Sequence, residues 1–146
     1  MIDNSTKKFL ETNLKGLMMD TIERMEKETA LLRKGGLYEA SPSEVKLFSA
    51  LRGRERSISE VARALGISRQ AVHKTNRRLM ELGVTELVEK SGNKRDKFIK
   101  ITENGLLVQI EGAKHLKIVE DKISQKIGKK NLELVRSLLL KNLKEV

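Results

Sequence analysis

The 146-residue sequence has no cysteine or tryptophan, a single proline and only 3% aromatic residues. Without cysteine, disulfide bonds, thiol redox sensing and cysteine-ligated zinc are excluded. The two histidines, His73 and His115, lie far apart in the sequence and outside any HExxH-type motif, so we expect no metal site. Because aromatic residues are scarce, the hydrophobic core must consist mainly of Leu, Ile, Val and Met.

Further absences narrow the class of function. No apolar run approaches the roughly 20 residues that span a bilayer, and the N-terminal segment lacks the apolar stretch of a signal peptide. We therefore expect a cytoplasmic protein without a membrane partner. Phosphate-binding loops of the GxxxxGKS/T or GxGxxG type are missing, and no serine stands in a GxSxG motif. The sequence predicts neither an enzyme nor a bound cofactor.

Positive charge is in excess and is concentrated in one third of the chain. Thirty Lys and Arg stand against twenty Asp and Glu, a formal net charge of +10. Residues 52–100 hold 13 of the cations and 6 of the acids, so 13 minus 6 places +7 in this segment. A focused positive charge is typical of proteins that bind polyanions such as nucleic acids.

The N-terminal segment has the periodicity of one long amphipathic helix, from about residue 5 to 34. Gly35 and Gly36 are expected to end it. A helix of about 30 residues is about 45 Å long, which exceeds what a small domain needs to cover its core. We therefore expect part of the apolar stripe to contact a second chain, through Leu10, Leu14 and Leu17.

A helix that begins after residue 41 is the first of three short helices. Ser41 and Glu44 have the spacing of a capping box, and Pro42 occupies the first helical position. The residues expected on its buried face are Val45, Phe48 and Leu51. The charged residues 54–57 are expected to form a connector to the next helix.

The next two helices have the pattern of a helix-turn-helix. The first begins at Ser57, with Glu60 at the capping-box position, and ends at Gly66. The second begins at Ser68 and ends at Gly83. Two helices joined by a short turn containing Gly form a helix-turn-helix. The apolar residues expected inside this motif are Val61, Ala62, Leu65 and, at the corner, Ile67.

The second helix of this pair separates an apolar side from a basic side. At about 100° per residue, the inward residues are Ala71, Val72, Thr75, Leu79 and Leu82. The outward arc carries side-chain types that read DNA, because Arg pairs with guanine, Gln with adenine, and Lys with a base or phosphate. A solvated amphipathic helix is the alternative, but the tight corner and the near absence of acid on this arc favour DNA contact. The predicted contact residues are Ser68, Arg69, Gln70, His73, Lys74 and Arg77.

After residue 83 the pattern changes to two short strands, residues 84–90 and 97–101. The segment SGNKRD between them, residues 91–96, has the Gly and Asn of a hairpin turn. A basic hairpin after a recognition helix is a wing, whose cations can follow the DNA backbone or enter the minor groove. The predicted wing contacts are Lys94, Arg95 and Lys97. An ordinary exposed turn is the alternative, and it competes most for Lys94 and Lys97.

Two more helices follow the wing. Thr102 caps a helix from about residue 103 to 127, Gly128 interrupts it, and residues 131–143 form a last amphipathic helix. The expected fold is therefore mainly α with a small β-wing.

This order of elements, with the segments LGISRQAVHKTNRRLMELG (residues 65–83) and GNKRDKFIKITENG (residues 92–105), resembles the MarR family of bacterial and archaeal transcription regulators. The resemblance implies a winged helix-turn-helix DNA-binding domain at residues 37–102 and a helical dimerisation region at residues 1–36 and 103–146. In such a homodimer each recognition helix reads one half of a pseudo-palindromic operator in double-stranded DNA, usually to repress transcription. The C-terminal residues expected at the dimer contact are Leu138, Leu139 and Leu143.

Two segments, the wing and the recognition helix, depart from the family pattern. The family wing usually carries Asp-x-Arg, whereas the matching segment here begins with Asn93, so an amide replaces the carboxylate that would orient Arg95. The adjacent Asp96 is a candidate substitute. Thr75 and Asn76 in the recognition helix stand where apolar residues are common. Asn76 lies at the edge of the core, which is the favoured interpretation, or it reaches DNA or caps a neighbour.

The resemblance also bears on regulation. Many family members release DNA when a small amphipathic ligand enters the cleft between the dimer arms and the winged domain, whereas others oxidise a cysteine. Without cysteine, only the first route is open, and it implies a small-molecule effector as a partner. The aromatic residues that such a pocket would use are instead expected to pack in the protein; they are Phe9, Tyr38, Phe48 and Phe98. His115 is a surface residue, a ligand contact or a pH-sensitive group, and the surface position is favoured.

Three classes of function compete. A sequence-specific dimeric regulator is favoured. An architectural DNA-binding protein would use the same basic segment with little sequence preference, so the ratio of specific to non-specific affinity separates these two classes. A protein-interaction adaptor built on the same scaffold would keep its activity when Arg69, Arg77 and Arg95 are neutralised.

Overall fold

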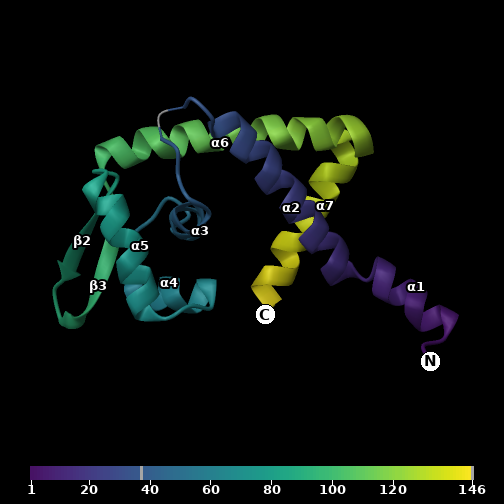
Figure 1. The fold of residues 1–146 in the computed structure, drawn as a ribbon, viewed down its shortest axis with the longest axis horizontal. Coiled ribbons are helices and arrows are strands. Elements are labelled where there is room, and N and C mark those ends of the chain that lie inside the picture. Colours follow the sequence, from purple (N-terminus) through teal and green to yellow (C-terminus); the bar gives the residue numbers. More distant parts are fainter. Residues whose placement is uncertain (37, 146) are drawn as a thin grey trace. The chain divides into compact units, whose positions relative to one another are not determined.

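The structure, a computed structural model, describes residues 1–36 and 38–145, except for the side chains of residues 93, 94 and 143–145. The chain divides into two compact units, and Figure 1 shows the order of their elements. Gly35–Gly112 form the first, called here the sheet-containing unit. Met1–Lys34 and Ala113–Val146 form the second, called the helical unit. Each unit is described by itself.

Three short helices of the sheet-containing unit begin at the serines that the sequence indicated. They are α3 (Pro42–Ala50), α4 (Ile58–Leu65) and α5 (Arg69–Glu81). The hydroxyls of Ser41, Ser57 and Ser68 each accept a hydrogen bond from the backbone N–H three residues later, at 3.3, 3.0 and 3.1 Å. At the first helix the Glu44 carboxylate also accepts from the Ser41 N–H at 3.0 Å, which confirms the predicted capping box.

An antiparallel sheet of three strands, in the order β1-β3-β2, packs with these helices. The strands are β1 (Arg56–Ser57), β2 (Thr85–Lys90) and β3 (Asn93–Ile101). The expectation that residues 54–57 form only a connector is wrong, because Arg56 pairs with Ile99 and Ser57 with Phe98 of β3. A strand of only two residues is too short to show an alternation of apolar and polar residues, so β1 can be recognised only from its pairing with β3.

The turn of the β2–β3 hairpin is shorter than the segment 91–96 that the sequence suggested. Only Ser91 and Gly92 separate the two strands, and Gly92 has a φ of 85°, which favours glycine. The strand pairing then skips residues 94–96 of β3, which bulge out of the regular register next to the turn. A bulge bends its strand, so Arg95 sits on an irregular stretch of backbone, whereas Lys97 is paired in register with Glu89.

The core of the sheet-containing unit is aliphatic, as the scarcity of aromatic residues predicted. Its buried members are Leu47, Leu51, Ile58, Val61, Ala62, Val72, Leu79, Val84 and Ile99. Tyr38 and Phe48 pack against this core from its edge, which confirms packing for two of the four aromatics. Phe98 is half-buried, whereas Phe9 in the helical unit is exposed and does not pack as expected.

Several positions expected in the core are less buried than predicted. Val45 and Phe48 are half-buried because α3 turns Leu47, together with Leu51, into the core instead. Ile67 and Leu82 are exposed. Both lie just outside a helix, Ile67 after the left-handed Gly66 that caps α4 and Leu82 as the C-cap of α5, where the helical period no longer fixes the direction of a side chain.

The first turn of α6 (Glu103–Ile127) is fixed against the end of α5. The Thr102 hydroxyl donates to the Gly83 carbonyl at 2.5 Å and accepts from the Gly105 N–H at 3.1 Å, so it caps α6 as predicted. A Cβ on Gly105 would collide with the carbonyl oxygen of Val84. Glycine is therefore required for this close approach of helix to backbone.

The N-terminal segment of the helical unit is not one helix, as the sequence predicted, but two. They are α1 (Asn4–Thr12) and α2 (Leu14–Arg33). Asn13 between them has an extended backbone, donates its amide to the Leu10 carbonyl at 2.9 Å and accepts from the Gly16 N–H at 2.9 Å. The apolar period continues across this point, but an asparagine side chain that bonds to both neighbouring turns ends one helix and caps the next.

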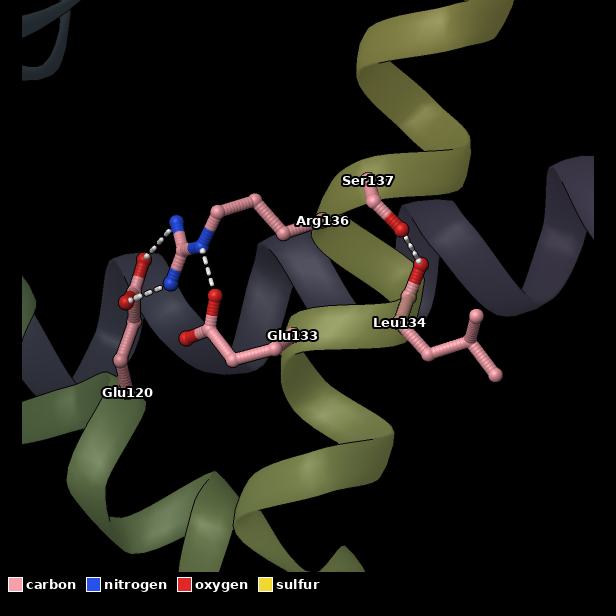
Figure 2. A network of polar contacts seen from close by, with 5 residues as sticks. All are labelled: Glu120, Glu133, Leu134, Arg136 and Ser137. Atoms are coloured by element: carbon pink, nitrogen blue, oxygen red, sulfur yellow. Dashed lines mark hydrogen bonds and ion pairs between the residues drawn. The ribbon is translucent and has the colours of Figure 1, made fainter.

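The C-terminal part of the helical unit is a pair of helices joined at Gly128. α6 runs into this unit, and α7 (Lys129–Glu145) begins two residues earlier than predicted. Figure 2 shows Arg136 of α7 between Glu120 of α6 and Glu133 of α7, with hydrogen bonds of 2.6 and 3.4 Å to Glu120 and 3.2 Å to Glu133. The Glu120 carboxylate, and then Glu133, raise the pKa of the Arg136 guanidinium further above its ordinary range. A charge-assisted clamp thus joins α6 to α7.

Candidate nucleic-acid interface

α5 presents its polar side to solvent and its apolar side to the core. Val72 and Leu79 are completely buried, as predicted. The opposite arc of the helix is exposed and carries Gln70, His73, Lys74 and Arg77, and Arg69 is exposed at the edge of this arc. The outward arc read from the sequence is therefore confirmed, while its contact with DNA stays a prediction.

The cations of α5 differ in their ion pairs. Arg78 Nε lies 3.8 Å from the Glu44 carboxylate of α3, and Arg78 Nη1 lies 3.6 Å from Glu81. Among the residues that the structure describes, no ion pair engages Lys74 or Arg77, which project from the exposed arc. Lys74 and Arg77 therefore keep their positive charge available to a polyanion, whereas Arg78 is directed toward α3.

The N-terminal end of α5 favours a negatively charged group. Ser68 satisfies one backbone donor by accepting from the Ala71 N–H, and the first turn contains no Asp or Glu. The aligned peptide dipoles place a partial positive charge at this end. Exposed Arg69 adds a full charge beside it. Such an end is suited to a phosphate group.

The wing is tied to α5 by an ion pair that the sequence did not indicate. Asp96 of β3 lies 3.9 Å from Arg69 Nη2. Arg95 and Lys97 are exposed, as a role in DNA contact requires, and the side chain of Lys94 lies outside the described residues. The carboxylate proposed as a substitute partner for Arg95 thus pairs with Arg69 of α5.

Lys90, a further wing cation, contacts both the hairpin and the segment that precedes β1. Its ammonium lies 4.3 Å from the centroid of the Phe98 ring and 3.3 Å from the Glu55 carboxylate. A cation over an aromatic face is attracted by the ring quadrupole. This side chain therefore braces the two strands below the turn.

A polar network between α3 and α5 was missed by sequence reasoning. The Tyr38 hydroxyl donates to Glu44 at 2.6 Å, and the same carboxylate accepts from the Ser41 N–H and faces Arg78. Burial, and then the hydrogen bond to Glu44, raise the pKa of Tyr38 well above its ordinary value of 10.0. The capping box identified Glu44, but no local pattern indicates its distant partners. A hollow of about 320 Å³ adjoins this network, lined by Ser41, Ser43, Glu44, Ala71, Lys74, Thr75 and Arg78.

Asn76 lies inside the protein, on the buried side of α5. It is 1% exposed, and its Oδ1 accepts a hydrogen bond from the Thr85 hydroxyl at 2.8 Å. The favoured interpretation of Asn76 as a core residue is therefore confirmed, and its burial is deeper than the expected core edge.

The leucines expected at a dimer contact are exposed in the single chain. Large apolar side chains are exposed on all the helices of the helical unit, and they include Leu10, Leu14, Leu17, Leu138 and Leu139. The side chain of Leu143 lies outside the described residues. Single exposed leucines are common, but the number of large apolar side chains exposed on this one unit exceeds that ordinary level.

Neither a metal site nor a membrane span is found in the part of the chain that the structure describes. No group of three or more His, Cys, Asp or Glu residues is placed to hold a metal ion there. None of its helices combines the length and the apolar character needed to cross a bilayer. His115 on α6 is half-buried, unlike the surface position favoured from the sequence, and its Nδ1 is buried without a hydrogen-bond partner in this part of the chain.

Comparison with known proteins gives no match in sequence but many in structure. No protein-family model and no curated protein matches this chain. The transcriptional regulator BldR from Sulfolobus solfataricus is similar over the whole of both chains, with a TM-score of 0.68 and 19% identity. Apo MarR from E. coli has a TM-score of 0.72 and 15% identity over 90% of this chain and 97% of its own. NadR in complex with 4-hydroxyphenylacetate has a TM-score of 0.72 and 17% identity, over 89% of this chain and 91% of its own.

These similarities show the fold. The chain has the winged helix-turn-helix fold of MarR-type transcription regulators, mainly α with a small antiparallel sheet. The fold expected from the sequence is thereby confirmed. In this fold α4 and α5 are the helix-turn-helix and the β2–β3 hairpin is the wing.

Proposed function

We propose that this chain is a homodimeric, sequence-specific DNA-binding regulator that represses transcription from a pseudo-palindromic operator in double-stranded DNA. Residues 37–102 bind the DNA, and residues 1–36 and 103–146 form the dimer contact. Each half-site receives one α5 helix in the major groove and one wing along the flanking backbone. The fold supports this proposal, since the solved neighbours are described as transcriptional regulators and not as enzymes.

The exposed arc of α5 is the observation that carries the proposal. Gln70, His73, Lys74 and Arg77 project from the side opposite Val72 and Leu79, and they include types that make bidentate contacts with adenine or guanine. The adjoining N-terminal end of α5 is free of acid. The basic arc and this helix end together offer full charges and the positive end of the helix dipole to a polyanion.

The dimer is proposed from the composition of the helical unit. Among its described residues only Thr29 and Val119 are buried. The burial of so few side chains does not offset the conformational entropy that is lost when the helices of this unit become ordered. A second copy that packs on the exposed leucines would complete the core, because a two-fold dimer presents the same patch from both chains. It would also place two recognition helices about 34 Å apart, one DNA turn.

A small-molecule effector that releases the DNA is part of the proposal. NadR, a neighbour in fold, was solved with 4-hydroxyphenylacetate. A ligand that binds only the DNA-free arrangement would weaken DNA binding by mass action. A panel of small aromatic acids, tested for a rise in Tm and a parallel loss of DNA affinity, would identify an effector. If no acid shifts both quantities, this part of the proposal fails without affecting the rest.

The decisive experiment is selection from sheared genomic DNA by the purified protein at near-physiological salt, followed by sequencing. A sharp inverted repeat with half-site centres about 10 base pairs apart supports the dimeric regulator. An architectural DNA-binding protein is the second candidate, which the +7 charge of residues 52–100 favours. Retention of many DNA fragments without a shared motif would identify the architectural protein. If no DNA is retained, both candidate functions are rejected.

A further inference from the structure

The Asn76 and Thr85 pair is buried between the recognition helix and the first strand of the wing. Thr85 of β2 is 3% exposed, and its hydroxyl donates to Asn76 Oδ1 of α5. Val72 and Leu79 lie four residues before and three residues after Asn76, so all three share one side of α5. Since both flanking residues are completely buried, the polar pair is enclosed by apolar side chains.

This pair costs stability compared with an apolar pair of the same shape. Asn76 Nδ2 is buried, and the described part of the chain contains no hydrogen-bond partner for it. A buried amide that makes only some of its hydrogen bonds loses the rest of its hydration on folding. Leucine at position 76 and valine at position 85 would have similar shapes and no such loss. Packing alone therefore does not account for the two polar side chains.

A hydrogen bond supplies what apolar packing lacks, which is direction. Apolar contacts are non-directional, so aliphatic packing alone leaves a helix alternative positions of similar energy. The ion pair between Arg69 and Asp96 also links α5 to the wing, but its Arg69 side chain is 59% exposed and the pair lies outside the core. The hydrogen bond from Thr85 fixes the distance and the angle between α5 and β2 at one point. Arg77 of the exposed arc follows Asn76 directly, and β2 leads from Thr85 to the wing. The pair thus joins the two elements that would contact DNA.

We propose that Asn76 is a positioning residue that, through Thr85, holds the recognition helix at a single angle to the wing and thereby sets the discrimination between DNA sequences. This inference rests on the proposed function, because it assigns a cause to sequence preference. It predicts that stability and specificity change in opposite directions when the pair is made apolar.

The first experiment needs no DNA. The Asn76→Leu/Thr85→Val variant is expected to melt about 3 °C or more above the wild type, while the amide resonances of α5 and β2 broaden from exchange on the microsecond to millisecond timescale. Thr29→Val, a buried threonine of the helical unit, is the matched control and is expected to leave these resonances sharp. If the resonances of α5 and β2 stay sharp in the double variant, the pair does not position the helix and the proposal is overturned.

The second experiment measures the ratio of affinities for the selected DNA site and for a scrambled site. The double variant and Thr85→Val are expected to lower this ratio by about tenfold, a typical coupling between sites. Thr85→Ser, which keeps the hydroxyl, is expected to retain the wild-type ratio. An unchanged ratio in Thr85→Val, or an equal loss in Thr85→Ser, overturns the proposal. If the wild-type protein binds all DNA sequences equally, the proposed function is rejected instead. The resonances of α5 and β2 would then still show whether the Asn76–Thr85 pair positions the helix.

Discussion

The guanidinium of Arg69 on α5 lies 3.9 Å from the carboxylate of Asp96 on β3, so an ion pair joins the first turn of α5 to the wing. The Arg69 side chain is 59% exposed and that of Asp96 only 20%. The carboxylate therefore orients a cation that remains accessible to solvent. Because the dipole of α5 favours negative charge at the same place, we expect Arg69 to contact a phosphate and not a base.

Arg69→Ala is accordingly expected to weaken binding to operator and non-operator DNA by similar factors. In a plot of log affinity against log salt concentration, the slope should become less steep by about 0.9 units, the value for one phosphate contact. Filter binding across a salt series measures both effects. Lys117→Ala removes one exposed charge from the helical unit and serves as the control, with an unchanged slope. A loss confined to the operator would make Arg69 a base contact.

Arg77 and Arg78 are neighbours in the sequence, but only the substitution of Arg77 is expected to change the base preference. Arg77→Ala should cost about 1 to 3 kcal/mol of operator affinity and relax the preference for one base pair in each half-site. Arg78→Ala should leave the base preference intact, because Arg78 is turned toward Glu44 and Glu81. Selection of DNA sequences by each variant measures these preferences. The assignment is contradicted if Arg78→Ala alters the motif and Arg77→Ala does not.

Local patterns in the sequence predicted most of the fold. The caps at Ser41, Ser57 and Ser68 were correct because a cap depends on a few adjacent residues. Two errors have a common cause. β1 is made by its pairing with Phe98 and Ile99, which lie some forty residues away in the sequence. The division between α1 and α2 depends on Asn13, which the continuous apolar period concealed.

The candidate site was predicted in part. The helical period placed the exposed arc of α5 correctly, since it needs only the burial of Val72 and Leu79. The contacts of the arc were not predictable in the same way. Arg69 meets Asp96, and Arg78 meets Glu44, across separations that no local motif spans. The pair with Glu44 directs Arg78 toward α3, whereas the pair with Asp96 leaves Arg69 exposed.

Leu139 is expected to lie in the dimer contact. Leu139→Glu should give a monomer with weak DNA affinity, because a charge buried at an apolar interface is costly. Light scattering coupled to size exclusion measures the mass. The control is Lys130→Glu, which lies nine residues earlier and so about half a turn around the axis of α7, and it should remain a dimer. A Leu139→Glu protein that still has the mass of a dimer would contradict the placement of Leu139.

Two glycines of α6 should respond to alanine in opposite ways. Gly105→Ala would force the first turn of α6 away from the Val84 carbonyl, so a loss of about 1 to 3 kcal/mol in the free energy of unfolding is expected. Gly112 has open space around its Cα, and Gly112→Ala should gain about 0.5 to 1 kcal/mol from helix propensity. Urea denaturation at fixed protein concentration compares the two. Equal effects would mean that the close approach at Gly105 does not limit the packing of α6.

The ion pair between Glu28 of α2 and Lys122 of α6 gives the helical unit a predictable response to pH. The Lys122 ammonium donates to Glu28 at 2.7 Å, and this hydrogen bond lowers the pKa of Glu28 below its ordinary value of 4.5. The folded chain then binds this proton less readily than the unfolded chain, so the contribution to stability is complete above that ordinary value and is lost as pH falls through the lower folded value. At neutral pH, Glu28→Gln should lower Tm slightly, because the pair is exposed. The difference from the wild type should be smaller at an acid pH, below the lowered pKa of Glu28, than at neutral pH. Glu26→Gln on the same helix is the control for the loss of one carboxylate, and a Glu28→Gln difference that is the same at both pH values would show that the ion pair does not contribute to stability.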